Sequence, residues 1–390
     1  MNAQDSKSAV RLCLAPGTWQ LIMLAAALRQ DRAEGGAPRA DRLLLFEPDG
    51  TAALKDWMLH LAPAVWSWDG VEWASDALHP RLPEHDWPWP IEAYKQAVRR
   101  VAGEGVVGEL WISQIEMFSY RLALETYPRA ALTVYEDGYW SPPVLRDESW
   151  AERYETPRTW LALALRGRLP AHDASRRLAT WHIASAYWKR ISRLYALLPA
   201  NLEPPPPYNR ARAVSIAKEH LVAALAGARG VLKEREVDVG KRDVLLLPQP
   251  FIQFLHGRPP AAVLKQEVEF YRDIVRDLLA RGYDVVWKDH PRGDASVFAE
   301  VGRGYPPGRV RKQDFPARLP VELMPGVQKF RHCVSITSSA LFYLNLLYGV
   351  GRWTCADRLM PLVTAERAEY LALPQFMRHC PVLADMPDAG

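Results

Sequence analysis

Short apolar runs alternate with segments of helical periodicity in the first and last thirds of the chain, and this alternation most limits the possible folds. Each run is a few residues long and is typical of a β-strand, whereas the intervening segments place apolar residues at three- and four-residue steps. Strands separated by helices form βαβ units with parallel strands. The predicted strands are residues 10–15, 42–47, 105–112, 131–135 and 332–336, with two more inside 243–250 and 283–292.

The middle of the chain breaks this alternation, because its pattern predicts helices at 150–165, 174–198 and 210–226. The proline-rich tract LEPPPPYNR can be neither helix nor central strand and indicates a stiff spacer. A chain of 390 residues is long enough for two domains. We therefore predict an α/β protein with two Rossmann-like domains, whose parallel sheets face a central cleft, and a helical insertion between them. The predicted parts are 1–150, 151–235, 236–360 and a C-terminal helical tail at 361–390.

Composition argues against several classes of protein. The four cysteines show no C-x-x-C spacing, which disfavours a zinc site and a disulfide framework. A formal net charge of +4 is too small to indicate nucleic-acid binding. No stretch reaches the roughly 18 uncharged apolar residues of a membrane span, and the N-terminal apolar run is too short for a signal peptide. We expect a cytoplasmic protein that is not integral to a membrane.

Three polar clusters directly follow three of the predicted strands. They are Glu136-Asp137-Gly138, the stretch from Lys288 to Arg292, and Thr337-Ser338-Ser339. Loops that leave the carboxyl ends of parallel strands are where such folds bind ligands. Together, a carboxylate, an imidazole and hydroxyls at a helix start could supply a base, an acid and a phosphate cradle.

Each cluster also has a purely structural explanation. Glu-Asp-Gly is an ordinary strand-to-turn sequence, since Asp tolerates turn geometry and Gly supplies positive φ. His290 precedes Pro291, and a residue before proline commonly belongs to an extended turn. Ser338 and Ser339 are good helix N-cap residues, which need no ligand.

The order of these clusters resembles bacterial sialyltransferases and polysialyltransferases. That family carries an (Asp/Glu)-Asp-Gly motif in the N-terminal domain, then a His-Pro motif and a Ser-Ser motif in the C-terminal one. Here they appear as Glu136-Asp137-Gly138, His290-Pro291 and Ser338-Ser339. The stretches DVLLLPQP, LPVELM and SITSSALFYLN occur among them with a similar alternation of strands and helices. The likeness is strong over about 240–350, moderate near 9–30 and 131–138, and absent from about 141–235.

The resemblance implies a glycosyltransferase of the GT-B architecture that uses a CMP-activated sialic acid or a related acidic sugar such as Kdo. It implies that Asp137 is the general base and that His290 protonates or hydrogen-bonds the departing phosphate. Glu136 remains a possible second carboxylate, because the sequence does not decide which of the two points into the cleft. The donor-binding residues implied are Ser338 and Ser339 for the phosphate, Glu322 for the ribose hydroxyls, Arg292 for the sugar carboxylate or acceptor, and Gln249 and Pro291.

The same resemblance bears on stereochemistry, metals and acceptor. A single displacement from opposite faces converts a β-linked donor into an α-linked product, so we expect inversion. The chain has no Asp-x-Asp triplet, the motif with which many nucleoside-diphosphate-sugar transferases bind a cation, so we expect metal-independent transfer without a cofactor. The expected partners are the CMP-sugar and a hydroxyl of a surface glycan, as in capsule or lipooligosaccharide synthesis.

A basic segment lies in the region that the resemblance does not cover. Residues 151–200 hold nine Arg and Lys against three Asp and Glu, and apolar residues recur at helical spacing from Leu178 to Ile191. Such a helix could contact an anionic membrane surface at the periphery of the inner membrane, or bind an acidic polysaccharide. It could equally pack on the protein core with a solvated basic side.

Two other functions stay open at this stage. One is a glycosyltransferase that uses another nucleotide sugar, which a panel of donors would distinguish. The other is a non-catalytic carbohydrate-binding or assembly protein with the same fold, which would tolerate loss of Asp137 and His290. The acceptor, the linkage, the oligomeric state and the choice between single and polymeric transfer are not encoded in any motif that we can interpret.

Overall fold

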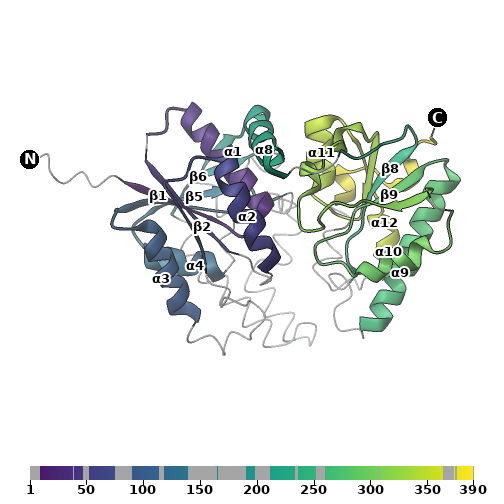
Figure 1. Cartoon of the computed structure of the whole chain (residues 1–390), viewed down its shortest axis with the longest axis horizontal. Coiled ribbons are helices and arrows are strands. Elements are labelled where there is room, and N and C mark those ends of the chain that lie inside the picture. The colour runs from purple at the N-terminus through teal and green to yellow at the C-terminus, as the bar shows by residue number, and fades with distance from the viewer. Residues whose placement is uncertain are drawn as a thin grey trace, which may run out of the picture. The chain divides into compact units, whose positions relative to one another are not determined.

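A computed structural model describes residues 9–37, 39–46, 52–74, 90–113, 118–138, 165, 190–197, 211–232, 236–251, 260–306, 308–362, 373 and 376–389. The chain divides into two compact units, Met1–Leu232 and Lys233–Gly390 (Figure 1). This division lies close to the start predicted for the C-terminal domain. Each unit contains one parallel β-sheet with helices on both faces, as the alternating pattern predicts.

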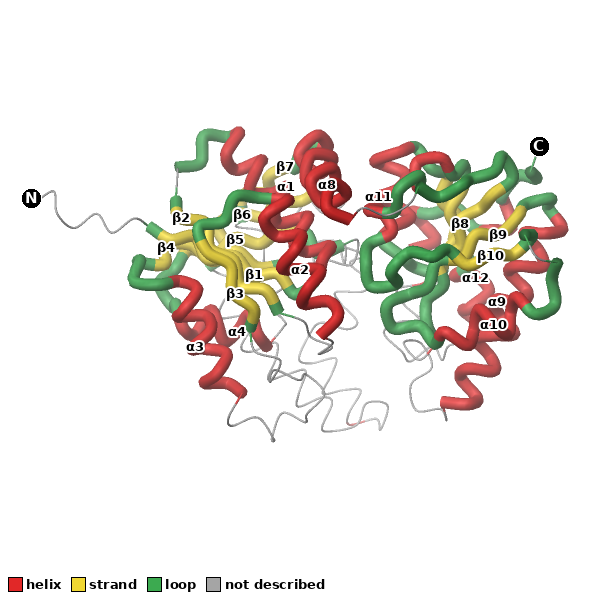
Figure 2. Tube along the Cα trace, viewed as in Figure 1, coloured by secondary structure: helices red, strands yellow, loops and turns green. Residues whose placement is uncertain are grey.

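The first unit is built on a seven-stranded parallel sheet of order β3-β2-β1-β4-β5-β6-β7. Helices α1, α2 and α8 pack together on one face, and α3 and α4 lie on the other (Figures 1 and 2). The strands are β1 (Val10–Ala15), β2 (Ala40–Leu45), β3 (Gly70–Trp73), β4 (Val107–Ile112), β5 (Ala131–Tyr135), β6 (Ile191–Ala196) and β7 (Arg212–Ser215). The helices are α1 (Thr18–Ala33), α2 (Ala52–Val65), α3 (Pro90–Ala102), α4 (Phe118–Thr126) and α8 (Lys218–Leu232).

The second unit has a five-stranded parallel sheet of order β10-β9-β8-β11-β12. Helices α9, α10 and α12 contribute to one hydrophobic core with this sheet, and α11 lies on the opposite face (Figure 2). The strands are β8 (Asp243–Leu247), β9 (Asp284–Trp287), β10 (Val310–Lys312), β11 (His332–Ser335) and β12 (Gly351–Thr354). The helices are α9 (Pro260–Ala280), α10 (Ala295–Gly302), α11 (Ala340–Tyr348) and α12 (Ala356–Leu359), with 3-10 turns η6 (Val321–Leu323), η7 (Val327–Lys329), η8 (Met360–Leu362) and η9 (Leu383–Asp385).

The middle of the chain differs from its prediction. Residues 191–196 form β6 rather than the end of a helix, and 212–215 form β7 before α8 begins at Lys218. Both strands extend the first sheet, and α8 packs on α1 and α2. The predicted helices at 174–198 and 210–226 are therefore wrong over these residues, because pairing of β6 with β5 and of β7 with β6 overrides a pattern that also suits a helix. Apart from Leu165, which is helical, the predicted helix at 150–165 lies outside the described residues, as do most of the basic segment and the proline-rich tract.

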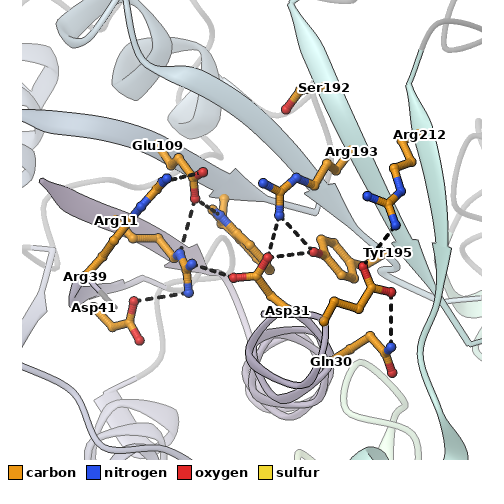
Figure 3. A network of polar contacts seen from close by, with 12 residues as sticks. Arg11, Gln30, Asp31, Arg39, Asp41, Glu109, Ser192, Arg193, Tyr195 and Arg212 are labelled. Atoms are coloured by element: carbon orange, nitrogen blue, oxygen red, sulfur yellow. Dashed lines mark hydrogen bonds and ion pairs between the residues drawn. The ribbon is translucent and has the colours of Figure 1, made fainter. Parts of the chain in front are cut away.

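A network of buried charges joins the amino-terminal ends of β1, β2 and β4 to the end of α1 (Figure 3). Arg11 lies at its centre and pairs with three buried carboxylates: Asp31 at 2.5 Å, Asp41 at 3.3 Å and Glu109 at 3.2 Å. Arg193 of β6 also reaches Asp31, whose Oδ1 accepts a hydrogen bond from the Tyr195 hydroxyl at 2.8 Å. The network ties β6 to the rest of the sheet, so Arg193 has a structural partner rather than a free basic side chain.

The C-terminal tail packs back on the second unit. Leu383 and Met386 are buried in its core, and the Tyr283 hydroxyl donates to the carbonyl oxygen of Pro387 at 2.9 Å. The described part of 361–390 contains short helical turns, while 363–372 lie outside the description. No helix in the described ranges combines the length and the apolar character needed to cross a bilayer.

Candidate functional site

The order of the second sheet locates its ligand-binding edge. The chain passes outward from β8 to β9 and β10 and then returns to place β11 on the other side of β8. In open parallel sheets, ligands bind at the carboxyl ends of the strands where the order reverses in this way. The loops at this point follow β8 and β11, and they contain Gln249 and Thr337 to Ser339.

Gln249 connects these two loops directly. Its side-chain Oε1 accepts a hydrogen bond from the backbone N–H of Thr337 at 2.6 Å, and the Thr337 hydroxyl lies 3.2 Å from the same oxygen. Thr337 is buried and Gln249 is half-buried, and these two bonds hold the loops together. The structure thus brings Gln249 beside the Ser-Ser stretch, as their shared assignment to one donor site requires.

Ser338 and Ser339 begin α11. The Ser338 hydroxyl accepts a hydrogen bond from the N–H of Ala340 at 3.3 Å, while Ser339 is the N-cap and makes no capping bond with its side chain. Within the described part of the chain, the N–H groups of Ser338 and Ser339 have no hydrogen-bond acceptor. Free N–H groups at the positive end of a helix dipole suit an anion.

His290 leaves the carboxyl end of β9, the strand that flanks β8 on the other side. Its Nδ1 accepts a hydrogen bond from the backbone N–H of Arg292 at 3.1 Å. Burial lowers the pKa of His290 to about 4, with the nearby charges of Lys288 and Arg292 contributing in the same direction. A neutral imidazole whose Nδ1 accepts carries its proton on Nε2. His290 therefore presents an Nε2–H donor, which can hydrogen-bond a phosphate.

The residues beside His290 have separate structural partners. Asp289 pairs with Lys312 of β10 at 2.5 Å and accepts from the Trp287 indole N–H at 2.8 Å. Lys288 is buried, and its ammonium donates to the carbonyl oxygens of Asp289 and Ala317 at 3.3 and 3.2 Å. Burial lowers the pKa of Lys288 to about 8, against the opposing charges of Glu322 and Asp289.

Glu322 lies in η6 and is also buried. Its negative charge acts on Lys288, so the carboxylate assigned to the ribose hydroxyls has a cationic neighbour from the β9 exit. No motif in the sequence gives Lys288 a role of its own. The signal that could have found it is a lysine directly after an apolar strand, where its ammonium must be buried or exposed at the ligand-binding edge.

The two adjacent carboxylates at the end of β5 differ sharply in environment. Glu136 is 1% exposed, and its Oε2 accepts a hydrogen bond from the N–H of Leu197 at 2.7 Å, which joins the exits of β5 and β6. Asp137 is only partly buried and accepts a hydrogen bond from the Gln20 side-chain amide at 2.5 Å. Gly138 follows with φ 151°, a backbone angle that favours glycine.

Gln20 brings the start of α1 to Asp137. In the first sheet the strand order reverses between β1 and β4, so the loop from β1 into α1 belongs to the ligand-binding edge of this unit. Asp137 follows β5, the next strand along, and the bond from Gln20 connects it to that edge. Glu136 and Asp137 thus lie in the first unit, and the other assigned residues share one edge of the second.

The described residues contain no group of three or more His, Cys, Asp or Glu side chains that could hold a metal ion. The four cysteines are all buried as free thiols. Burial raises the pKa of the Cys13 and Cys333 thiols well above the ordinary value. None of them therefore has the depressed pKa of a reactive thiol.

Comparison with known proteins agrees with the sequence resemblance. Residues 185–357 match the family model described as alpha-2,8-polysialyltransferase, a range that runs from just before β6 to α12. No curated protein sequence matches the chain.

Several solved structures are similar to the model. The UDP-GlcNAc 2-epimerase from Methanocaldococcus jannaschii is 10% identical with a TM-score of 0.52, covering 97% of this chain and 93% of its own. The UDP-GlcNAc 2-epimerase from Neisseria meningitidis is 11% identical with a TM-score of 0.50, covering 95% and 90%. A sialyltransferase from Photobacterium damsela is 15% identical with a TM-score of 0.39, covering 86% of this chain and 72% of its own.

At these identities the likeness to the epimerases concerns the fold alone, which is two Rossmann-like units with parallel sheets. The family match adds the kind of protein, because it spans the His-Pro and Ser-Ser stretches. The chain therefore has the GT-B fold of two Rossmann-like units, and over residues 185–357 it is similar to a glycosyltransferase family, the alpha-2,8-polysialyltransferases.

Proposed function

We propose that this protein transfers sialic acid, or a related nonulosonic or Kdo-type acidic sugar, from its CMP donor to a hydroxyl of a surface glycan. The proposal rests on the position of Gln249, His290 and the Ser338-Ser339 stretch, which follow neighbouring strands at one edge of the second sheet. All of them lie inside the range that matches the polysialyltransferase family model. Those loops offer hydrogen-bond donors for a phosphate.

The donor phosphate binds at the start of α11 in this proposal. The N–H groups of Ser338 and Ser339 and the helix dipole stabilise its charge, which grows as the glycosidic bond breaks. His290 adds its Nε2–H as a fixed neutral donor, because the Arg292 N–H occupies Nδ1. Glu322 accepts from the ribose hydroxyls, and the Arg292 side chain faces the sugar carboxylate or the acceptor. Pro291 stabilises the turn that contains His290 and Arg292.

Asp137 is the general base in this proposal. A hydroxyl is a poor nucleophile, and a carboxylate that takes its proton as the new bond forms accelerates such a step by about 10²- to 10⁴-fold. The bond from the Gln20 amide fixes the Asp137 side chain. Glu136 has a structural role in this proposal, which its burial and its bond from the Leu197 N–H support.

Attack on the face opposite the departing CMP inverts the anomeric centre, so a β-linked donor yields an α-linked product. The protons balance within the step: the acceptor hydroxyl gives its proton to Asp137, and CMP leaves with its charge held by hydrogen bonds. We propose that no metal ion takes part, since a nucleoside monophosphate has less charge to neutralise than a diphosphate.

Peripheral contact with the inner membrane stays part of the proposal through the basic segment at 151–200. Two of its nine basic residues are described, and both are used inside the first unit. Arg190 donates to the carbonyl oxygens of Tyr127 and Ala130 at 3.3 and 2.8 Å, and Arg193 pairs with Asp31. Co-sedimentation with anionic liposomes tests the rest, and binding that survives replacement of the other seven would contradict a role for them.

The experiment that tests the function measures nucleotide release and product formation from a panel of donors. Purified protein is incubated with CMP-sialic acid, CMP-Kdo or UDP-GlcNAc and with sialylated and unsialylated oligosaccharides. We expect turnover of a CMP-sugar that depends on acceptor and is lost in Asp137→Ala. Turnover of UDP-GlcNAc alone, or full activity in Asp137→Ala, would contradict the proposal.

A further inference from the structure

Tyr271 of α9 makes an unusual contact with the loop that leaves β8. Its hydroxyl accepts a hydrogen bond from the backbone N–H of Gln249 at 2.6 Å and donates one to the carbonyl oxygen of Gln249 at 2.9 Å. One phenol therefore satisfies both backbone polar groups of the same residue. Tyr271 is fully buried, and burial raises the pKa of its phenol well above the ordinary value, so the hydroxyl keeps its proton.

The Gln249 side chain continues the chain of contacts. With its backbone held by Tyr271, Gln249 directs Oε1 to the N–H of Thr337 at 2.6 Å. Thr337 immediately precedes Ser338 and Ser339, whose N–H groups begin α11. A line of hydrogen bonds thus runs from α9 through the β8 exit to the β11 exit, across the point where the strand order reverses.

A second bond from α9 supports the same loop. The Glu267 carboxylate accepts from the N–H of Phe251 at 2.9 Å, one helical turn before Tyr271. Pro250, between the two held residues, has no N–H to satisfy. Phe251 is fully buried and its ring lies 6.1 Å from that of Tyr271. Residues 249–251 are therefore fixed by α9 on both sides of the proline.

We propose that Tyr271 is a positioning residue for donor binding, which holds the Ser338-Ser339 N–H groups in place through Gln249 and Thr337. The inference rests on the proposed function, because it takes these N–H groups to bind the CMP phosphate. Tyr271 has no need to touch the donor itself. Removal of its hydroxyl leaves the N–H and carbonyl of Gln249, a half-buried residue, without their partner, and the loop relaxes to satisfy them elsewhere.

The relaxation should weaken donor binding more than it weakens the fold. A backbone group left without a partner costs free energy, and a tenfold loss of affinity corresponds to about 1.4 kcal/mol. If the bound state must restore the loop geometry, CMP should bind about tenfold more weakly to Tyr271→Phe. The turnover number at saturating donor should change less, because His290 and Asp137 are not in this line of bonds.

Tyr283 supplies a matched control in the same unit. It is also a buried tyrosine, and its hydroxyl donates to the carbonyl oxygen of Pro387 at 2.9 Å, beside the amino end of β9 and therefore at the other edge of the sheet. Tyr283→Phe removes a partly buried hydroxyl hydrogen bond without touching the β8 exit. A purely structural role for both hydroxyls predicts losses of thermal stability with unchanged affinity for CMP.

The test is titration calorimetry of CMP with the full chain, its Y271F and Y283F variants, and thermal unfolding of each. The expected result is about tenfold weaker CMP binding in Y271F, with KM for the donor raised more than kcat is lowered, and near-normal binding in Y283F. Equal affinity in all three proteins overturns the inference and leaves the proposed function intact. A wild-type protein that binds no CMP refutes the proposed function and the inference together. Should Y271F fail to fold, Gln249→Met replaces it, because it removes the oxygen that accepts from the Thr337 N–H and hydroxyl. Unchanged CMP affinity in that variant overturns the inference, and about tenfold weaker binding supports it.

Discussion

The protonation state of His290 gives the sharpest prediction about chemistry. Its Nδ1 accepts from the Arg292 N–H at 3.1 Å, and its pKa is lowered to about 4. At pH 7 only about one molecule in 10³ then carries an imidazolium. We therefore expect His290 to act as a neutral hydrogen-bond donor through Nε2, rather than as a general acid that needs a second proton.

Three variants separate these roles. In His290→Gln the side-chain amide nitrogen reaches the position of Nε2, whereas in His290→Asn it reaches only the position of Nδ1. A hydrogen bond to a charged group contributes about 1.5–3 kcal/mol, so His290→Ala should lose about 10- to 150-fold in kcat. His290→Gln should retain most of that factor, and His290→Asn should resemble His290→Ala.

The assay is CMP release from CMP-sialic acid at saturating donor, followed from pH 5 to 9. If His290 is a neutral donor, the kcat of the wild-type protein should not fall with an apparent pKa of about 6–7 as pH rises. The pH profile of His290→Gln should then have the same shape. The reasoning is refuted if His290→Gln is as inactive as His290→Ala and the wild-type rate falls above an apparent pKa near 6.5, as a general acid would require.

Further predictions concern the carboxylates, the buried charges and pH. Asp137→Asn should lose about 10²- to 10⁴-fold in kcat with an unchanged melting temperature, whereas Glu136→Gln should mainly reduce stability; the opposite pattern would reverse their roles. Arg11→Met leaves three buried carboxylates without their common partner (Figure 3), so urea unfolding should show a loss of about 3–5 kcal/mol, and a loss below 1 kcal/mol would contradict that reading. Because the pKa of His290 is lower in the folded than in the unfolded chain, its contribution to stability should be complete above about pH 6.5 and lost as pH falls toward 4; His290→Gln should remove that part of the pH dependence. Activity should survive EDTA, and complete loss that Mg²⁺ restores would contradict metal-independent transfer.

Most of the two sheets could be predicted from the sequence. Strands β1 and β5 have the predicted bounds, because each is a mostly apolar run, interrupted only by Arg11 or Thr133, and nearly all of it is buried in a parallel sheet. Strands β3, β7, β10 and β12 were not predicted. They are three or four residues long, include polar residues and lie at or beside the edges of their sheets, where one side of the strand needs no apolar run.

The candidate site was predictable in part, for a similar reason. Residues that follow strand ends, such as Asp137 and His290, can be recognised because the sequence changes there from apolar to polar. Tyr271 and Glu267 do not, because they lie in the middle of an amphipathic helix and reach the β8 exit only through the fold. The difference between Glu136 and Asp137 likewise depends on Leu197, a residue of a strand exit that the sequence pattern assigned to a helix.

A crystal structure of the protein with CMP tests the central claim most directly, since it requires no knowledge of the acceptor. The account predicts that the CMP phosphate accepts hydrogen bonds from the Ser338 and Ser339 N–H groups and from His290 Nε2, with the ribose at Glu322. CMP bound at another edge of the second unit, with those N–H groups facing solvent, would contradict it.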